Sequence, residues 1–316
     1  MTTAPRVSIA IPLHNEQETV AELLLRVGAV LDGTPGGPHE VVIVDDGSSD
    51  GTLDLLENAA AQDDRVLVVS LSRNFGHQAA LSAGLDHVTG DVVVTMDGDL
   101  QDPPEAIPAL LAKLGDGYDV VYAQRVNRHE PWWLRFSYYL FYRLLARLST
   151  LQLPLDAGDF SIMSRRVVNQ IKQAPERQRY IRGLRTWVGF RQTGIAVDRS
   201  ARFAGSSKYS LRRLVGLAFD GIFAFSTLPL RAAAVLGALA IALSTAFAVY
   251  SLYAKIFLSQ TPRGFTALVF IITFLSGVNL LFLGVIGEYV GRVYEEVKTR
   301  PLYVVQKLIG RRRDPA

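Results

Sequence analysis

The amino-acid sequence predicts an α/β fold, in which a mostly parallel β-sheet domain precedes a C-terminal hairpin of two transmembrane helices. Short β-branched runs alternate with longer amphipathic stretches through the first 125 residues, as in strand–helix–strand repetition. Two long segments near the C-terminus carry no charged residue. The 316 residues suffice for one α/β domain of about 200 residues and a smaller appendage.

The first part of the chain contains five apolar runs that predict strands buried on both faces. These runs are Val7–Leu13, Glu40–Val44, Val66–Leu71, Val92–Met96 and Val120–Ala123. The stretches between them predict the helices Glu16–Leu31, Gly51–Ala61, Gly76–His87 and Pro104–Leu114. In parallel sheets of this kind, ligands bind beyond the carboxyl ends of the strands.

The two uncharged segments are Ala232–Ala254 and Phe265–Gly287. As helices they would each extend roughly 35 Å, enough to cross a hydrocarbon layer of about 30 Å. Basic residues follow the second segment, and the positive-inside rule places this flank in the cytoplasm. Lys255 and Arg263, near the short connection, are exceptions. We therefore expect an inner or plasma membrane protein with two spans.

The predicted domain boundaries follow from these changes in composition. Aromatic and leucine residues interleaved with arginines predict an interfacial helix at Trp132–Leu153, with a core-packing helix as the alternative. Gly287 and Gly291 allow close helix approach, so a homo-oligomer formed through the spans is a further expectation. The boundaries are 1–208 for the cytoplasmic domain, 209–228 for an interfacial amphipathic helix, 229–291 for the spans and 292–316 for a basic cytoplasmic tail.

The overall composition excludes several kinds of site. The absence of cysteine excludes disulfides, thiolate metal sites and cysteine nucleophiles. A hydrophobic fraction of 49% is too high for an ordinary soluble enzyme. The net charge of +3 suits an anionic surface or substrate, although we expect no nucleic-acid partner. No glycine-rich dinucleotide fingerprint and no phosphate-loop motif is present, which argues against a dehydrogenase or a P-loop ATPase.

The sharpest polar cluster is Asp97-Gly98-Asp99, directly after the fourth predicted strand. Two carboxylates at this spacing can bind one hard cation, and Mg²⁺ or Mn²⁺ combines few protein carboxylates with phosphate oxygens. Such a cation would neutralise a diphosphate leaving group. The alternative is an Asx-type turn that caps the next helix.

Three more polar clusters follow the first three predicted strands. Their carboxylates can accept hydrogen bonds from a base or from ribose hydroxyl groups. The alternative is helix capping by Asn15 and Asp50, and the two interpretations are compatible. The clusters are residues 12–16, 44–50 and 72–78.

The chain contains six short motifs whose sequences and order resemble those of the inverting family-2 glycosyltransferases. These enzymes have the GT-A fold, a Rossmann-like architecture. The resemblance is greatest to the polyprenyl-phosphate glycosyltransferases, relatives of dolichol-phosphate mannose synthase, and it covers nearly the whole chain. The motifs are Pro-Leu-His-Asn-Glu at 12–16, Val-Asp-Asp-Gly-Ser at 44–48, Arg-Asn-Phe-Gly-His at 73–77, Asp-Gly-Asp-Leu-Gln-Asp-Pro-Pro at 97–104, Asp-Ala-Gly-Asp-Phe at 156–160 and Ser-Ser-Lys-Tyr at 206–209.

The resemblance implies a role for each matching position. It assigns Pro12, His14, Glu16 and Asp46 to the base and ribose pocket, Asp97 and Asp99 to the metal and diphosphate site, and Gln101 to the sugar. Asp159 matches the acidic position near the acceptor, and Asp159 and Asp99 are the implied catalytic residues. Arg125, Arg202, Ser207 and Lys208 match a cationic set that grips phosphates. The family often has Tyr at the position of His14 and Ala at that of Gly98, and neither departure removes a needed functional group.

The implied reaction is inverting transfer of glucose from UDP-glucose to undecaprenyl or another polyprenyl phosphate. GDP-mannose or another UDP-sugar, such as an amino-arabinose, is the alternative donor. A processive polysaccharide synthase is disfavoured, because the chain has two spans and only Arg185-Thr186-Trp187 of a Gln-x-x-Arg-Trp motif. A non-catalytic membrane scaffold is the non-enzymatic alternative. A group of arginines is expected to be solvated or to face lipid headgroups: Arg177, Arg179, Arg182 and Arg185.

Overall fold

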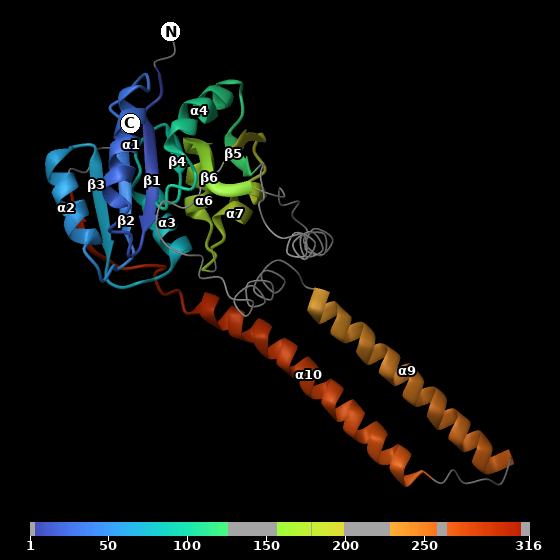
Figure 1. Ribbon diagram of the computed structural model, residues 1–316. Coiled ribbons are helices and arrows are strands. Elements are labelled where there is room, and N and C mark those ends of the chain that lie inside the picture. The colour runs from blue at the N-terminus through green and yellow to red at the C-terminus, as the bar shows by residue number, and fades with distance from the viewer. Residues whose placement is uncertain (1–3, 126–156, 178, 199–227, 258–263, 311–316) are drawn as a thin grey trace. The chain divides into compact units, whose positions relative to one another are not determined.

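A computed structural model describes residues 4–125, 157–177, 179–198, 228–257 and 264–310. The described residues form two compact units (Figure 1). The first contains the sheet and its helices, and it includes the chain from residue 300 onward. The second contains the two long helices near the C-terminus.

The centre of the sheet is a parallel arrangement of four strands. β1 pairs with β2 on one side and with β4 on the other, and β3 pairs with β2. The chain therefore reverses its direction of winding beside β1, which is where open α/β sheets bind ligands. The strands are β1 (Val7–Leu13), β2 (Glu40–Asp45), β3 (Val66–Leu71) and β4 (Val92–Thr95).

Four further strands widen the sheet to eight, in the order β7-β5-β6-β4-β1-β2-β3-β8. β6 runs antiparallel to both of its neighbours, and β5 is parallel to β7. β8 pairs antiparallel with β3. These strands are β5 (Val120–Arg125), β6 (Ala157–Ser164), β7 (Gln192–Val197) and β8 (Val305–Ile309).

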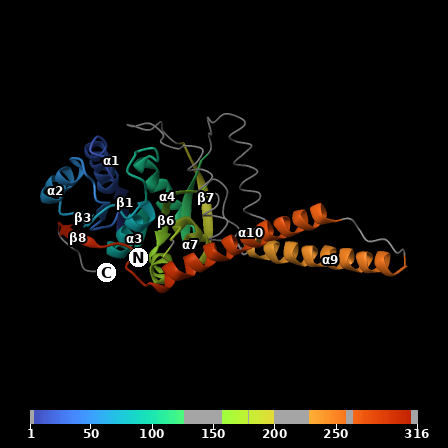
Figure 2. The same ribbon diagram turned by 90° about the horizontal axis from the view of Figure 1, so that it is seen from below.

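Helices cover both faces of the sheet (Figures 1 and 2). The strand period of two sends Val41 and Ile43 into one apolar core, with α1, α2 and α4, and sends Val42 and Val44 into the other, with α3, α6 and α7. This two-sided burial explains the continuous apolar runs. The helices are α1 (Val20–Asp32), α2 (Thr52–Gln62), α3 (His77–His87), α4 (Ile107–Gly115), α6 (Arg165–Gln173) and α7 (Ile181–Trp187).

The structure confirms the predicted α/β class, and the predicted strands agree within two residues at each end. The first helix begins at Val20 and not at Glu16, because a turn at Glu16–Thr19 follows Asn15, whose φ is 54°. The helix predicted at Pro104–Leu114 is a 3-10 turn, η1 (Pro104–Ala106), continued by α4. The sequence analysis did not assign β6, α6, α7, β7 or β8.

Two long apolar helices, α9 (Leu228–Phe257) and α10 (Phe265–Val297), contact each other in the second unit. Within them, Val235–Ala254 and Phe274–Val297 are apolar and long enough to cross a membrane, and neither window is buried. Exposed leucine, isoleucine and phenylalanine side chains cover both. The interfacial helices predicted at 132–153 and 209–228 lie outside the described residues.

Residues 292–316 were described from the sequence only as a basic tail, and β8 within them was missed. α10 continues to Val297, and β8 then pairs with the outer edge of β3. Tyr303, just before β8, donates a hydrogen bond of 2.7 Å from its hydroxyl to Asp86 on α3. Lys307 forms an exposed ion pair with Glu57. Gln306 and Lys307 interrupt the apolar pattern of this strand, and they concealed it.

We expect Tyr303→Phe to lower the free energy of unfolding by about 1.5 kcal/mol, because Asp86 loses a half-buried hydrogen bond to its carboxylate. Lys307→Ala is the matched control, and it should cost less than about 1 kcal/mol since its ion pair with Glu57 is exposed. Thermal unfolding of the detergent-solubilised protein, followed by circular dichroism, measures both. Equal midpoints for wild type and Tyr303→Phe would mean that this hydrogen bond does not fasten the strand.

Candidate active site

The carboxyl ends of β1, β2, β3 and β4 lie at one edge of the sheet, and antiparallel β6 begins at the same edge. Thr95, the last residue of β4, is paired with Ser161 of β6. The Thr95 hydroxyl donates a hydrogen bond of 2.7 Å to the backbone carbonyl of Asp159, 64 residues away in the chain. This pairing brings Asp159 beside Asp97, which follows β4.

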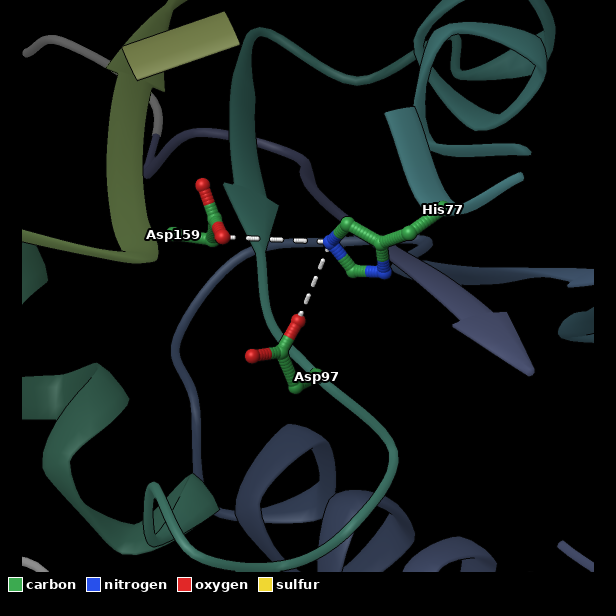
Figure 3. A group of neighbouring side chains, drawn as sticks. All are labelled: His77, Asp97 and Asp159. Atoms are coloured by element: carbon green, nitrogen blue, oxygen red, sulfur yellow. Dashed lines mark ion pairs between the residues drawn. The ribbon is translucent and has the colours of Figure 1, made fainter. Parts of the chain in front are cut away.

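His77 joins these two carboxylates from the first position of α3 (Figure 3). Its Nε2 atom lies 3.5 Å from Oδ1 of Asp97 and 3.8 Å from Oδ2 of Asp159. Burial lowers the pKa of His77, but the two carboxylates outweigh it and raise the pKa above its ordinary value. The three side chains therefore form one electrostatic cluster in which the imidazole favours its charged form.

Arg182 of α7 binds Asp159 from the other side. Its Nε and Nη2 atoms donate to the two carboxylate oxygens at 2.7 and 2.5 Å, which is the bidentate geometry of strong ion pairs. Asp159 is only 8% exposed. Burial acts to raise its pKa, but His77 and Arg182 together hold the pKa below the ordinary range. The ionised form of Asp159 is thus favoured, and both of its oxygens accept hydrogen bonds from Arg182.

Asp97 has the opposite character. Its Oδ1 atom is buried and accepts no hydrogen bond from the described residues. Burial and the negative charge of Asp159 raise the pKa of Asp97 to about 6, against the effect of His77. The negative charge of this carboxylate is therefore not fully compensated by its surroundings, and a bound divalent cation would compensate it.

The donor set fits a cation bound on Asp97 better than one bound between all three side chains. Ligand atoms of His77, Asp97 and Asp159 do lie within 4.8 Å of one another. However, Arg182 already occupies both oxygens of Asp159, and displacing it would leave a half-buried guanidinium without this partner. Of these two carboxylates, Asp97 is therefore the better metal ligand.

Asp99 accepts a hydrogen bond of 3.1 Å from the backbone N–H of Gln101, so the Asx-type turn given as the alternative is present, but it does not cap η1, whose N-cap is Pro103. Leu100 between them has a φ of 56°. A carboxylate has several lone pairs, so this turn leaves capacity for a metal ion. Both side chains are half-buried and lie beside Asp97 in the chain. Their predicted contacts with metal and sugar stay predictions.

Asp46 organises the loop that carries His77. It is 3% exposed, and its two oxygens accept hydrogen bonds from the backbone N–H groups of Phe75 (2.7 Å) and Gly76 (2.9 Å). Gly47, with φ 63°, lets this loop approach, since a Cβ there would lie 2.4 Å from the carbonyl carbon of Arg73. The role predicted for Asp46 in binding base or ribose stays a prediction.

The remaining base-pocket residues lie at the end of β1 and in the turn after it. Pro12 is buried, His14 is exposed and Glu16 is half-buried. Asp50 caps α2 as expected, because it accepts the N–H of Thr52 at 3.0 Å. The expectation that Asn15 caps a helix is wrong, because its Oδ1 atom accepts the N–H of Ser49 instead.

The predicted phosphate-binding set is not brought together in the described part of the chain. Arg125 ends β5, and its side chain is not among the described ones. Arg202, Ser207 and Lys208 lie outside the described residues.

The expectation that Arg182 and Arg185 are solvated or face lipid is wrong. Arg182 pairs with Asp159, and Arg185 is 2% exposed, with its guanidinium 5.0 Å from the ring centroid of Tyr122. Burial lowers the pKa of Arg185 to about 10. The sequence held a signal for Arg185, which shares the inward helix face with Ile181 and Leu184. No local pattern pointed to Arg182.

Comparisons with known proteins found a matching family model and relatives that cover nearly the whole chain. A family model described as glycosyl transferase family 2 matches residues 8–172. An uncharacterized glycosyltransferase of Synechocystis is 46% identical over 96% of this chain and 96% of its own. The SfII prophage-derived bactoprenol glucosyl transferase of Shigella flexneri is 38% identical over 96% and 98%. The undecaprenyl-phosphate 4-deoxy-4-formamido-L-arabinose transferase of Enterobacter is 36% identical over 97% and 94%.

We expect Arg182→Ala to lower the free energy of unfolding by about 3–5 kcal/mol, because it leaves the buried Asp159 carboxylate without its main partner. Adding Asp159→Asn to this variant should restore part of the loss, since the unpaired charge disappears. Chemical unfolding of the single and double variants measures both effects. Lys113→Ala, which breaks an exposed pair with Asp116, is the control and should change little. A double variant no more stable than Arg182→Ala would contradict the ion-pair account.

Proposed function

The chain belongs to glycosyl transferase family 2, and on that basis we propose that it transfers a hexose from a nucleotide sugar to a polyprenyl phosphate. Two relatives that match nearly the full chain carry names with a bactoprenol or undecaprenyl-phosphate acceptor. UDP-glucose is the favoured donor, because one of these names specifies a glucosyl transferase. The amino-sugar name of the other keeps a second UDP-sugar open, and GDP-mannose remains the further alternative.

The observation that carries this proposal is the acidic cluster at the strand edge. Asp97 combines a half-buried carboxylate with a raised pKa and an oxygen that lacks a hydrogen bond from the described residues. Such a group suits a cation that binds a diphosphate. Asp159 lies at the same edge of the sheet, on β6. It is 8% exposed and forms an ion pair with Arg182. Donor diphosphate on Asp97 and acceptor near Asp159 is the arrangement that this geometry supports.

The proposed reaction is a single in-line displacement. A phosphate oxygen of the acceptor forms a bond to the anomeric carbon, and the bond from that carbon to the nucleotide diphosphate breaks on the opposite face. The electron pair of the broken bond leaves with the nucleoside diphosphate, and the configuration of the sugar inverts. The product is a lipid monophosphate sugar, β-linked when the donor is α-linked.

Asp159 orients the acceptor in this proposal and does not remove a proton. Its pKa is held low, and both of its oxygens bind Arg182. No general base is needed, because a phosphate monoester with a second pKa near 6 is mostly dianionic at pH 7. Arg182 and His77 also add positive charge where two anionic substrates must meet.

Asp97 and Asp99 would hold Mg²⁺ or Mn²⁺. When bound, the ion stabilises the negative charge that develops on the leaving diphosphate. His77 stays 3.5 Å from Asp97 and keeps that carboxylate oriented toward the edge. The half-buried Gln101 follows in the same turn, where it would contact the sugar.

The exposed apolar helices α9 and α10 support a membrane anchor for this enzyme, which must meet a lipid substrate at the membrane surface. The positive-inside rule favours both flanks on the cytoplasmic side. A non-catalytic scaffold is the competing function, and it predicts no consumption of nucleotide sugar. Self-association through the spans stays a prediction.

Purified protein should transfer radiolabel from UDP-glucose into the lipid phase when undecaprenyl phosphate and Mg²⁺ or Mn²⁺ are present. Release of UDP should depend on the lipid, because the acceptor phosphate is the nucleophile. Parallel reactions with GDP-mannose and other UDP-sugars identify the donor. No transfer from any donor by folded protein would favour the scaffold.

Removal of divalent cations with EDTA should abolish transfer, and re-addition of Mg²⁺ or Mn²⁺ should restore it. Asp97→Asn should lower kcat about 100-fold or more, because it removes a charge that holds the ion at the leaving group. Asp116→Asn, an exposed aspartate paired with Lys113, is the matched control and should keep wild-type turnover. Full activity in EDTA would refute the metal site.

A further inference from the structure

A cavity of about 390 Å³ opens beside the start of α3, within the first unit. One wall is the first turn of α3 with Phe75 before it, and a second wall is the segment between α6 and α7. Leu302, in the connection that leads to β8, lines it as well. The cavity lies next to the acidic cluster, because His77 is part of both.

The charged groups that line the cavity are Arg177 and Arg179, and no aspartate or glutamate is among the described lining residues. The first two N–H groups of α3, those of His77 and Gln78, also have no partner within the helix. Together these groups make the cavity electropositive, and it therefore suits an anion.

Hydrogen bonds from one nitrogen of its guanidinium to backbone carbonyl oxygens hold the Arg179 side chain in place. Nη2 donates to the carbonyl oxygens of Ala174 at 2.8 Å and of Lys172 at 3.3 Å. Its Nε and Nη1 atoms are buried and have no hydrogen-bond partner among the described residues. Buried guanidinium N–H groups without an acceptor are costly, and a bound anion would satisfy them.

The cavity also has an apolar side. The ring of Phe75 and the side chain of Leu302 belong to its lining. A free inorganic anion would bury no apolar surface against these side chains. A phosphate that carries a hydrocarbon chain would bury its chain there, which stabilises binding.

We propose that this cavity binds the phosphate group of the lipid acceptor, with Arg177 and Arg179 as its cationic ligands and Phe75 and Leu302 against the first isoprenoid unit. The inference rests on the proposed function, and it adds two arginines to the acceptor set expected from the sequence. His77 lines the cavity and lies 3.5 Å from Asp97, so the cavity adjoins the aspartate that we propose for the diphosphate site.

Binding of farnesyl phosphate to the full-length protein in detergent, without donor, tests this by isothermal titration calorimetry. Arg179→Met should weaken binding about tenfold or more, because charge-assisted hydrogen bonds are lost. Arg177→Met should act in the same direction without touching the backbone contacts of Arg179. Arg191→Met, at an exposed arginine that stacks on Tyr118, is the control and should bind as wild type does. UDP-glucose affinity should not change in any variant, which verifies folding.

Two further ligands in the same titration distinguish a lipid phosphate from free phosphate. Inorganic phosphate should bind more weakly than farnesyl phosphate, and farnesol should not bind, if both the charged and the apolar walls are used. Wild-type affinity for farnesyl phosphate in both arginine variants would overturn the inference. If that occurred while sugar transfer persisted, the acceptor site would lie elsewhere and the proposed function would stand. Arginine-dependent binding without any transfer would instead refute the proposed function alone.

Discussion

The ion pair between Arg182 and Asp159 is the interaction on which the acidic edge depends. A carboxylate that is 8% exposed cannot remain ionised without a partner, and the bidentate contact supplies one. The same contact fastens α7 to the start of β6. Burial and the negative charge of Asp159 together raise the pKa of Asp97, and His77 lies 3.8 Å from Asp159. The ion pair thus contributes to the charge balance of the whole cluster.

The topology of the sheet brings Asp159, with its partner Arg182, close to Asp97. Parallel β4 delivers Asp97 at its carboxyl end, and antiparallel β6 starts where β4 stops. A parallel strand in the position of β6 would place its first residues at the far edge of the sheet. The single reversal therefore puts an acidic residue from a distant part of the chain opposite the aspartates that follow β4, and the Thr95 hydroxyl fixes their register.

Short-range patterns predicted the features that depend on them. Apolar runs located β1 to β5 because both faces of these strands are buried, and polar residues after each run marked the edge of the sheet. Asp159 was implied only by family resemblance. Arg182 was missed because its partner is 23 residues away and a surface arginine has the same local pattern. The ligand contact expected of Asp46 stays a prediction, and the two backbone N–H groups that its oxygens accept come from a loop that no local pattern places beside it.

The position of β8 also has a consequence for biosynthesis. The ribosome makes this strand only after both apolar helices, so β3 emerges with an open edge of backbone N–H and C=O groups. That edge closes when the segment after α10 pairs with it. The last step in completing the sheet therefore follows synthesis of the anchor. A chain that stalls before residue 305 would leave β3 as an unpaired edge strand, which can pair with other chains and aggregate.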